Sequence, residues 1–163
     1  WLNKMPFLPN IDESTKPIAV NTAERFATAG NYRKAIDILL KDNSNPYYSL
    51  REYRLANYYN KIGNKNDSAA YWAQRCIEMK PLCYSPVRVL VNIAGKKGDS
   101  QKQLDLINSY LEKYQLEPLA WEDKIVILQR LKKDQEALET IRKAKEYMPR
   151  NSKIKKLEEK LIK

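Results

Sequence analysis

The stretch "GNYRKAIDIL", residues 30–39, joins a glycine, a polar residue and a pair of a small and a large apolar residue in one short phrase. Similar phrases begin further along the chain, "GNKNDSAAYW" at Gly63, "GDSQKQLDLI" at Gly98 and "KKDQEALETI" at Lys132. Their starting positions lie 33, 35 and 34 residues apart. A constant period of this size indicates a chain built from one repeated structural unit.

Each unit is expected to contain two helices. Apolar residues at helical spacing precede each glycine, as Leu55, Ala56 and Tyr59 do in the second unit. A glycine supplies the backbone conformation that a helix end needs, and a polar residue directly after it can start the next helix. These predicted starting residues are Asn31, Asn64 and Asp99. A proline then ends each unit because it cannot continue a helix, and these are Pro46, Pro81, Pro118 and Pro149.

A period near 34 with a glycine inside the unit and a proline at its end resembles the tetratricopeptide (TPR) family of helix–turn–helix repeats. The resemblance implies an all-α fold in which four helix pairs and a closing helix wind into a right-handed α–α superhelix, or solenoid. The expected organisation is an N-terminal arm or end of a linker at 1–15, repeats at about 16–46, 47–81, 84–118 and 119–149, and a capping helix at 150–163.

The third and fourth units depart from the family pattern. Lys132 stands where a glycine is expected, and Gln103 and Tyr110 stand where the pattern asks for small residues. The second small position holds Cys76 in the second unit, which predicts a small buried hydrophobic residue there rather than a reactive thiol. Whether Cys76 and Cys83 form a bridge stays open at this stage.

No catalytic arrangement is found in the sequence. The chain has no histidine, which removes the usual general base and the commonest metal ligand. It contains neither of the glycine-rich phosphate-binding motifs. Neighbouring carboxylates such as Glu122 and Asp123 point in different directions on a helix and make poor acid–base pairs. We therefore expect a protein that is not an enzyme, with no catalytic residues, metal site, cofactor or small-molecule substrate.

The family resemblance implies a concave groove, lined by the first helix of each unit, that binds a peptide or protein segment. The predicted groove residues are Tyr53, Asn57, Asn60, Arg88, Asn92, Lys96, Glu122 and Gln129. Side-chain amides can bond to the backbone of an extended peptide, and Tyr and Arg are frequent in binding hot spots. The carboxylates of Glu122 and Asp123 argue against the carboxylate clamp of the family's Hsp70/Hsp90 co-chaperones.

The chain is strongly basic, with 30 Lys and Arg against 20 Asp and Glu and a net charge of +10. The excess gathers at the C-terminal end in a predicted basic patch of Arg142, Lys143, Lys145, Arg150, Lys153, Lys155 and Lys156. Such a patch is compatible with peripheral contact with an anionic membrane surface. Few aromatic or amide side chains are interleaved with it, which argues against a nucleic-acid partner.

These observations favour a non-catalytic protein–protein interaction scaffold. Two alternatives stay open, a soluble accessory domain of a larger, membrane-anchored bacterial protein such as one that handles glycans, and a basic adaptor that contacts RNA or anionic lipid. The chain begins at Trp1, so we expect it to be part of a longer protein, and "WLNKMPFLP" is too short and too broken for a transmembrane helix. Both the cytoplasm and the soluble extramembrane part of a membrane protein fit this sequence.

Overall fold

The computed structural model describes residues 18–42 and 49–161, and in these residues the chain forms helices and no strands. The helices are α1 (Ile18–Thr28), α2 (Tyr32–Lys41), α3 (Leu50–Ile62), α4 (Asn66–Met79), α5 (Tyr84–Lys96), α6 (Ser100–Leu111), α7 (Pro118–Arg130), α8 (Asp134–Tyr147) and α9 (Ser152–Leu161). The predicted arm at 1–15 and the end of the first repeat near Pro46 lie outside the described residues.

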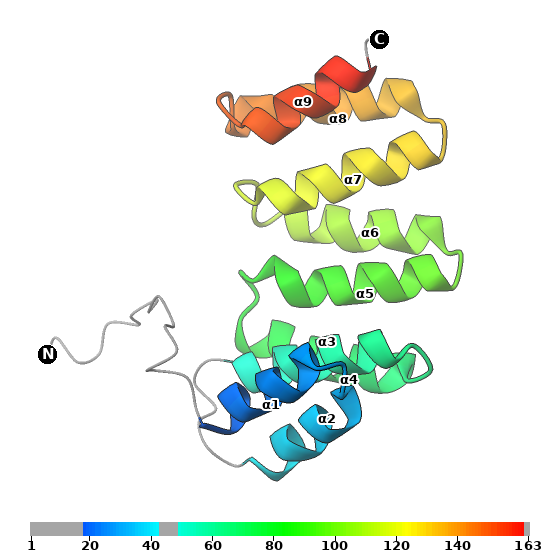
Figure 1. The fold of residues 1–163 in the computed structure, drawn as a ribbon. Coiled ribbons are helices and arrows are strands. Elements are labelled where there is room, and N and C mark those ends of the chain that lie inside the picture. The colour runs from blue at the N-terminus through cyan, green and yellow to red at the C-terminus, as the bar shows by residue number, and fades with distance from the viewer. Residues whose placement is uncertain (1–17, 43–48, 162–163) are drawn as a thin grey trace, which may run out of the picture.

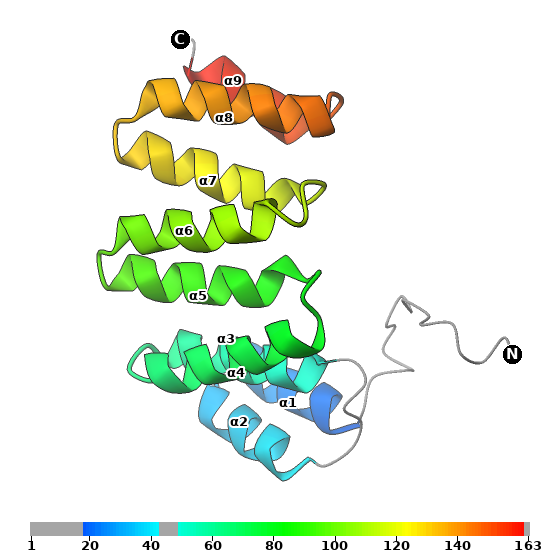
Figure 2. The same ribbon diagram turned by 180° about the vertical axis from the view of Figure 1, so that it is seen from behind.

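The helices pack in pairs along the chain, α1 with α2, α3 with α4, α5 with α6 and α7 with α8. Each pair contacts the next, and α9 packs on both α7 and α8. The pairs are stacked one above another from α1 and α2 to α9 (Figures 1 and 2). This arrangement is an all-α solenoid, which confirms the predicted fold class. No helix in the described ranges is both long and apolar enough to cross a membrane.

Three of the four turns inside the helix pairs use a glycine with left-handed backbone, as predicted. Gly30, Gly63 and Gly98 have φ angles of 79°, 89° and 75°. Lys132 takes the same place in the fourth turn with a φ of 58°. A residue with a Cβ atom is strained in this region, whereas glycine is not. The tight turn of the helix pair therefore imposes the left-handed conformation even where the residue disfavours it.

The helix starts follow the prediction at two of three turns. The side-chain oxygen of Asn31 accepts a hydrogen bond from the backbone N–H of Lys34 (3.2 Å), and that of Asp99 accepts one from Lys102 (2.9 Å). The prediction for Asn64 is wrong, because α4 begins only at Asn66 and no side chain caps its start. The second unit has one extra residue in this turn, which places Asn64 too early to reach the helix.

The core is divided into clusters that follow the helix pairs. One cluster joins α1, α2 and α3, a second joins α3, α4 and α5, and the largest extends from α5 to α9. Fully buried alanines, Ala35, Ala69 and Ala137, lie in the second helix of three pairs and let the helices approach closely. Ile154 of α9 is fully buried against the last pair. In the described part of the chain, the main helix contacts thus lie within a pair or between neighbouring pairs, which is the packing of a solenoid.

Gln103 and Tyr110 of the third unit stand where small residues are expected, and both are accommodated by hydrogen bonds. For Gln103, the missing side chain at Gly95 also provides space. Gln103 is buried; its Nε2 donates to the carbonyl of Val91 (3.0 Å) and its Oε1 accepts from Arg130 (2.5 Å). A Cβ atom on Gly95 would lie 2.6 Å from Gln103 Nε2, so the missing side chain at Gly95 makes the space for this amide. The buried Tyr110 donates its hydroxyl hydrogen to the carbonyl of Leu82 (2.7 Å).

The two cysteines are free thiols with different surroundings. Cys76 is buried and Cys83 is exposed. The Cys76 thiol lies 3.5 Å from the carbonyl oxygen of Ser49, and burial raises its pKa to about 11. The prediction that Cys76 is a small buried hydrophobic residue is confirmed.

Candidate functional site

The predicted groove residues lie on three helices that contact one another in sequence. Tyr53, Asn57 and Asn60 lie on α3, Arg88, Asn92 and Lys96 on α5, and Glu122 and Gln129 on α7. Their spacings of three, four or seven residues place them on one side of each helix. Helix α3 contacts α5, and α5 contacts α7. We call the surface that carries these eight residues the A-helix face.

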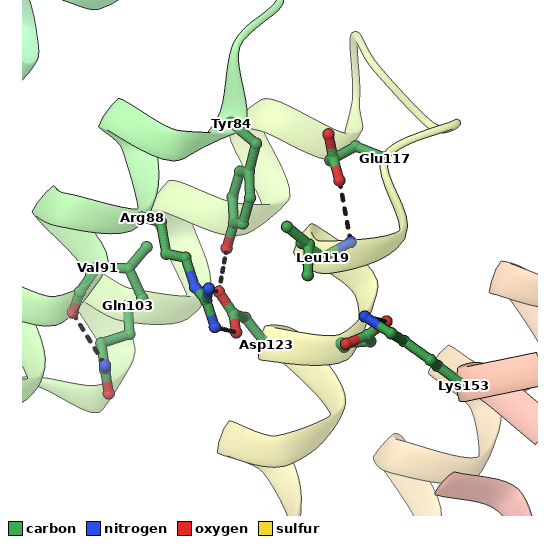
Figure 3. A network of polar contacts seen from close by, with 9 residues as sticks. Tyr84, Arg88, Val91, Gln103, Glu117, Leu119, Asp123 and Lys153 are labelled. Atoms are coloured by element: carbon green, nitrogen blue, oxygen red, sulfur yellow. Dashed lines mark hydrogen bonds and ion pairs between the residues drawn. The ribbon is translucent and has the colours of Figure 1, made fainter. Parts of the chain in front are cut away.

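The centre of the A-helix face is a network around Asp123 (Figure 3). Arg88 donates from Nε to Asp123 Oδ2 (2.8 Å) and from Nη2 to Asp123 Oδ1 (3.0 Å). The hydroxyl of Tyr84 also donates to Asp123 Oδ2 (2.9 Å). One carboxylate on α7 thereby receives three hydrogen bonds from two side chains of α5. Such two-pronged guanidinium–carboxylate pairs are geometrically specific as well as strong.

Polar contacts join every consecutive pair of odd-numbered helices. Glu24 of α1 and Arg54 of α3 form an ion pair of 2.6 Å. Lys96 of α5 donates to both the backbone and the side-chain oxygen of Asn60 on α3, each at 2.6 Å. Glu122 of α7 faces Lys153 of α9 at 3.5 Å. Together with Arg88–Asp123 these contacts form four bridging pairs, which tie α1, α3, α5, α7 and α9 in series.

The bridging pairs include four of the eight predicted groove residues and leave four outside, one of which, Tyr53, is half-buried with its ring centre 5.6 Å from the guanidinium carbon of Arg54. Arg88, Asn60, Lys96 and Glu122 are engaged within the chain. The side chains of Asn57, Asn92 and Gln129 form no hydrogen bond with any part of the chain that the structure describes. Asn92 is exposed, and Asn57 and Gln129 are half-buried. Among the described residues, the hydrogen-bonding groups of these three side-chain amides are unused.

The central network is suited to positioning rather than to proton transfer. The hydrogen bond to Asp123 raises the pKa of the Arg88 guanidinium. Burial, and next the charge of Asp123, raise the pKa of the Tyr84 hydroxyl far above its ordinary value. Both groups therefore keep their protons at neutral pH. In the described ranges, no three or more His, Cys, Asp or Glu side chains gather as a metal site would require.

Asp123, Arg54 and Tyr84 form hydrogen bonds or ion pairs on this face but are not among the eight predicted groove residues. The sequence indicates for Asp123 only a carboxylate beside Glu122 that argues against a carboxylate clamp, whereas in the structure it is the acceptor at the centre of the network. A signal for it exists in the sequence. Arg88 and Asp123 stand 35 residues apart, about one repeat, so equivalent sides of successive first helices present opposite charges.

The predicted basic patch lies on α8, on α9 and on the turn between them. Two of its members are paired with carboxylates, Lys145 with both oxygens of Glu158 (3.0 and 2.8 Å) and Lys153 with Glu122. The other members are exposed and form no ion pair with the described part of the chain; they are Arg142, Lys143, Arg150, Lys155 and Lys156. The patch is thus a partly neutralised basic end of the solenoid.

No protein-family model matches the chain, and no curated protein matches it in sequence. Solved structures of MamA have the same fold. One MamA structure has a TM-score of 0.65 at 16% identity and covers 83% of this chain and 79% of its own. Another has a TM-score of 0.61 at 15% identity, with coverages of 81% and 72%. MamA is a TPR-type repeat protein, and the likeness fits a TPR-like fold for this chain.

Proposed function

We propose that this chain is a non-catalytic protein-interaction scaffold and that its A-helix face binds an extended segment of another protein. The observation that carries the proposal is a set of three amides, Asn57, Asn92 and Gln129, on three successive first helices, that have no hydrogen-bond partner within residues 18–42 and 49–161. An extended peptide offers one backbone donor and one acceptor at each residue. An Asn or Gln side chain can both donate and accept, so each amide can engage one peptide unit of the bound segment.

The spacing of the helices suits an extended ligand. Asn57 and Asn92 are 35 residues apart and occupy equivalent positions on α3 and α5. Packed helices lie about 9 Å apart, and an extended chain advances about 3.3 Å per residue. Successive amides are therefore expected to contact every third residue of a segment that crosses the helices.

The bridging pairs support this function by holding the helices at fixed separations. A surface that is already ordered loses less conformational freedom on binding than a mobile one. Asp123 neutralises Arg88, and Lys153 faces Glu122, so these charges of the face are paired, whereas Lys96 bonds only to the neutral Asn60. Val126, 50% exposed on α7, adds an apolar contact. The preferred ligand is accordingly an uncharged or mixed segment with at least one apolar side chain.

The proposal is tested by selecting peptides from a display library against the chain and measuring the affinity of the selected peptides for variants. The double variant Asn57→Ala, Asn92→Ala removes two amides and is expected to weaken binding by about tenfold or more, since each hydrogen bond contributes on the order of 1 kcal/mol. Asn64→Ala, in the exposed turn before α4, is the matched control and should bind normally. Equal affinity for the double variant and the control would refute the proposal.

A further inference from the structure

A separate pocket of about 460 Å³ lies between α6, α7 and α8. Its lining includes Trp121 and Lys124 from α7 and Lys143 from α8. Lys124 follows Glu122 of the A-helix face by two residues, which is about 200° around the helix. The pocket therefore opens on another side of α7 from the proposed peptide-binding surface.

The aromatic part of the pocket is held in place by its own contacts. Trp121 is buried, and its indole Nε1 donates to the carbonyl of Gln115 (2.8 Å). Its ring stacks with that of Tyr147 at a centroid distance of 6.0 Å and an interplanar angle of 24°. This wall is ordered, and its one indole donor is already satisfied.

Two lysines, Lys124 and Lys143, contribute positive charge to the pocket. Lys124 is half-buried and Lys143 is exposed, and neither forms a hydrogen bond or ion pair with the described ranges of the chain. Burial lowers the pKa of the Lys124 ammonium, and the positive charge of Lys143 lowers it further, against a smaller opposite effect of Glu136. A partly buried charge without a partner is costly, and an anion between the two ammonium groups removes that cost.

We propose that this pocket binds the carboxylate of an acidic side chain from a protein partner, between Lys124 and Lys143. The amide of Asn108, which also lines the pocket, is a further hydrogen-bond donor for the bound carboxylate. The site does not depend on peptide binding at the A-helix face, and it offers a partner a second, charged point of attachment.

The charge of the surroundings selects a carboxylate over a phosphate. Glu112 also lines the pocket, and α6 and α8 end beside it at Leu111 and Tyr147. Helix C-termini carry partial negative charge, so these groups offset part of the charge of the two lysines. Subtracting Glu112 from the two lysines leaves a charge of about +1, since Glu136 is itself paired with Lys133 at 2.8 Å, and this charge matches a singly charged carboxylate better than a phosphate dianion.

The test is a titration of the isotopically labelled chain with sodium acetate and, separately, with inorganic phosphate, at constant ionic strength, followed by NMR. Acetate is expected to give saturable shifts at residues of α6, α7 and α8 around the pocket and to raise the pKa of Lys124. Lys124→Met should weaken acetate binding by about tenfold, because one of two charge-assisted contacts is lost. Lys102→Met, on the exposed first turn of α6, should leave it unchanged.

Three results would overturn the proposal: no saturable shift with acetate, equal binding by Lys124→Met that retains its helical circular dichroism, or tighter binding of phosphate than of acetate. The double variant Asn57→Ala, Asn92→Ala serves as the control for the A-helix face. It is expected to bind acetate like the unaltered chain, so the outcome is independent of the proposed peptide-binding function.

Discussion

Arg88 on α5 and Asp123 on α7 lie one repeat apart in sequence and form a two-pronged ion pair with N–O distances of 2.8 and 3.0 Å. The same carboxylate also accepts the hydroxyl hydrogen of the buried Tyr84. The pair therefore has two roles: it fixes the third helix pair against the fourth, and it neutralises the arginine that the groove pattern would otherwise present to a ligand.

Removing Asp123 is expected to cost more stability than removing Arg88. Arg88→Met loses an ion pair whose arginine side chain is 47% exposed, so we expect a loss of about 0.5–1 kcal/mol in the free energy of unfolding. Asp123→Ala also leaves the buried hydroxyl of Tyr84 without its acceptor, and the expected loss is about 2 kcal/mol. Urea unfolding followed by circular dichroism measures both.

Tyr84→Phe provides the control for this comparison. In the Asp123→Ala background it removes the unsatisfied hydroxyl and should recover part of the lost stability, although it destabilises the unaltered chain. Equal effects of Tyr84→Phe in both backgrounds would contradict the role assigned to the hydroxyl.

Gly95 and Gln103 are expected to be energetically coupled. Gly95→Ala improves helix propensity by about 1 kcal/mol but pushes the Gln103 amide away from the carbonyl of Val91. We expect a net destabilisation of about 1 kcal/mol, since a buried hydrogen bond is broken. In a double-mutant cycle, Gln103→Ala should lower the free energy of unfolding by at least about 1 kcal/mol less in the Gly95→Ala background than in the unaltered chain. Strict additivity of the two changes in stability would contradict the explanation that the missing side chain at Gly95 makes space for the Gln103 amide.

Replacing Lys132 by glycine is expected to stabilise the chain. Lys132 has a φ of 58°, where a Cβ atom is strained and glycine is not. The relief outweighs the added freedom of glycine in the unfolded chain, and we expect a gain of about 0.5–1 kcal/mol, visible as a higher urea midpoint. Lys97→Gly is the matched control, because Lys97 has a right-handed backbone with a φ of −85°. The explanation fails if both substitutions change stability in the same direction.

The two thiols are expected to react at very different rates. Cys83 is exposed, whereas Cys76 is buried with a pKa of about 11 against an ordinary value of 9.0. Two pKa units reduce the reactive thiolate of Cys76 roughly a hundredfold at pH 8, and burial slows access further. Iodoacetamide labelling followed by mass spectrometry should show one fast modification, at Cys83, and Cys83→Ser should abolish it. Equally fast labelling of Cys76 would contradict its burial.

The resemblance of the repeat to the TPR pattern implied the solenoid, and the glycines predicted three of the four turns inside its helix pairs. The glycines at 30, 63 and 98 repeat because a left-handed residue is needed at each turn, and this requirement is local enough to be visible in sequence. Asn64 failed as a predicted helix start because one inserted residue shifts the boundary of α4 to Asn66. The sequence shows that Gln103 is too large for the repeat pattern. It does not show that Gly95 provides space for the Gln103 side chain, because this depends on the packing between α5 and α6.

The candidate site was only partly predictable. The repeat pattern places Tyr53, Asn57 and Asn92 on successive first helices, but it does not tell which polar residues are already paired within the chain. Four of the eight predicted groove residues belong to bridging pairs, a result that requires the separation and tilt of neighbouring helices. The pocket at Lys124 was not predicted, since it combines residues of three helices from two units.

The most direct test of the account is an NMR measurement of the side-chain amide groups in a complex with a selected peptide. The NH₂ resonances of Asn57 and Asn92 are expected to shift on binding and to show contacts to every third residue of the peptide, while that of Asn64 stays unchanged. Unchanged resonances of Asn57 and Asn92 in a saturated complex, with shifts confined to α2, α4 or α9, would contradict the claim that the A-helix face is the binding surface.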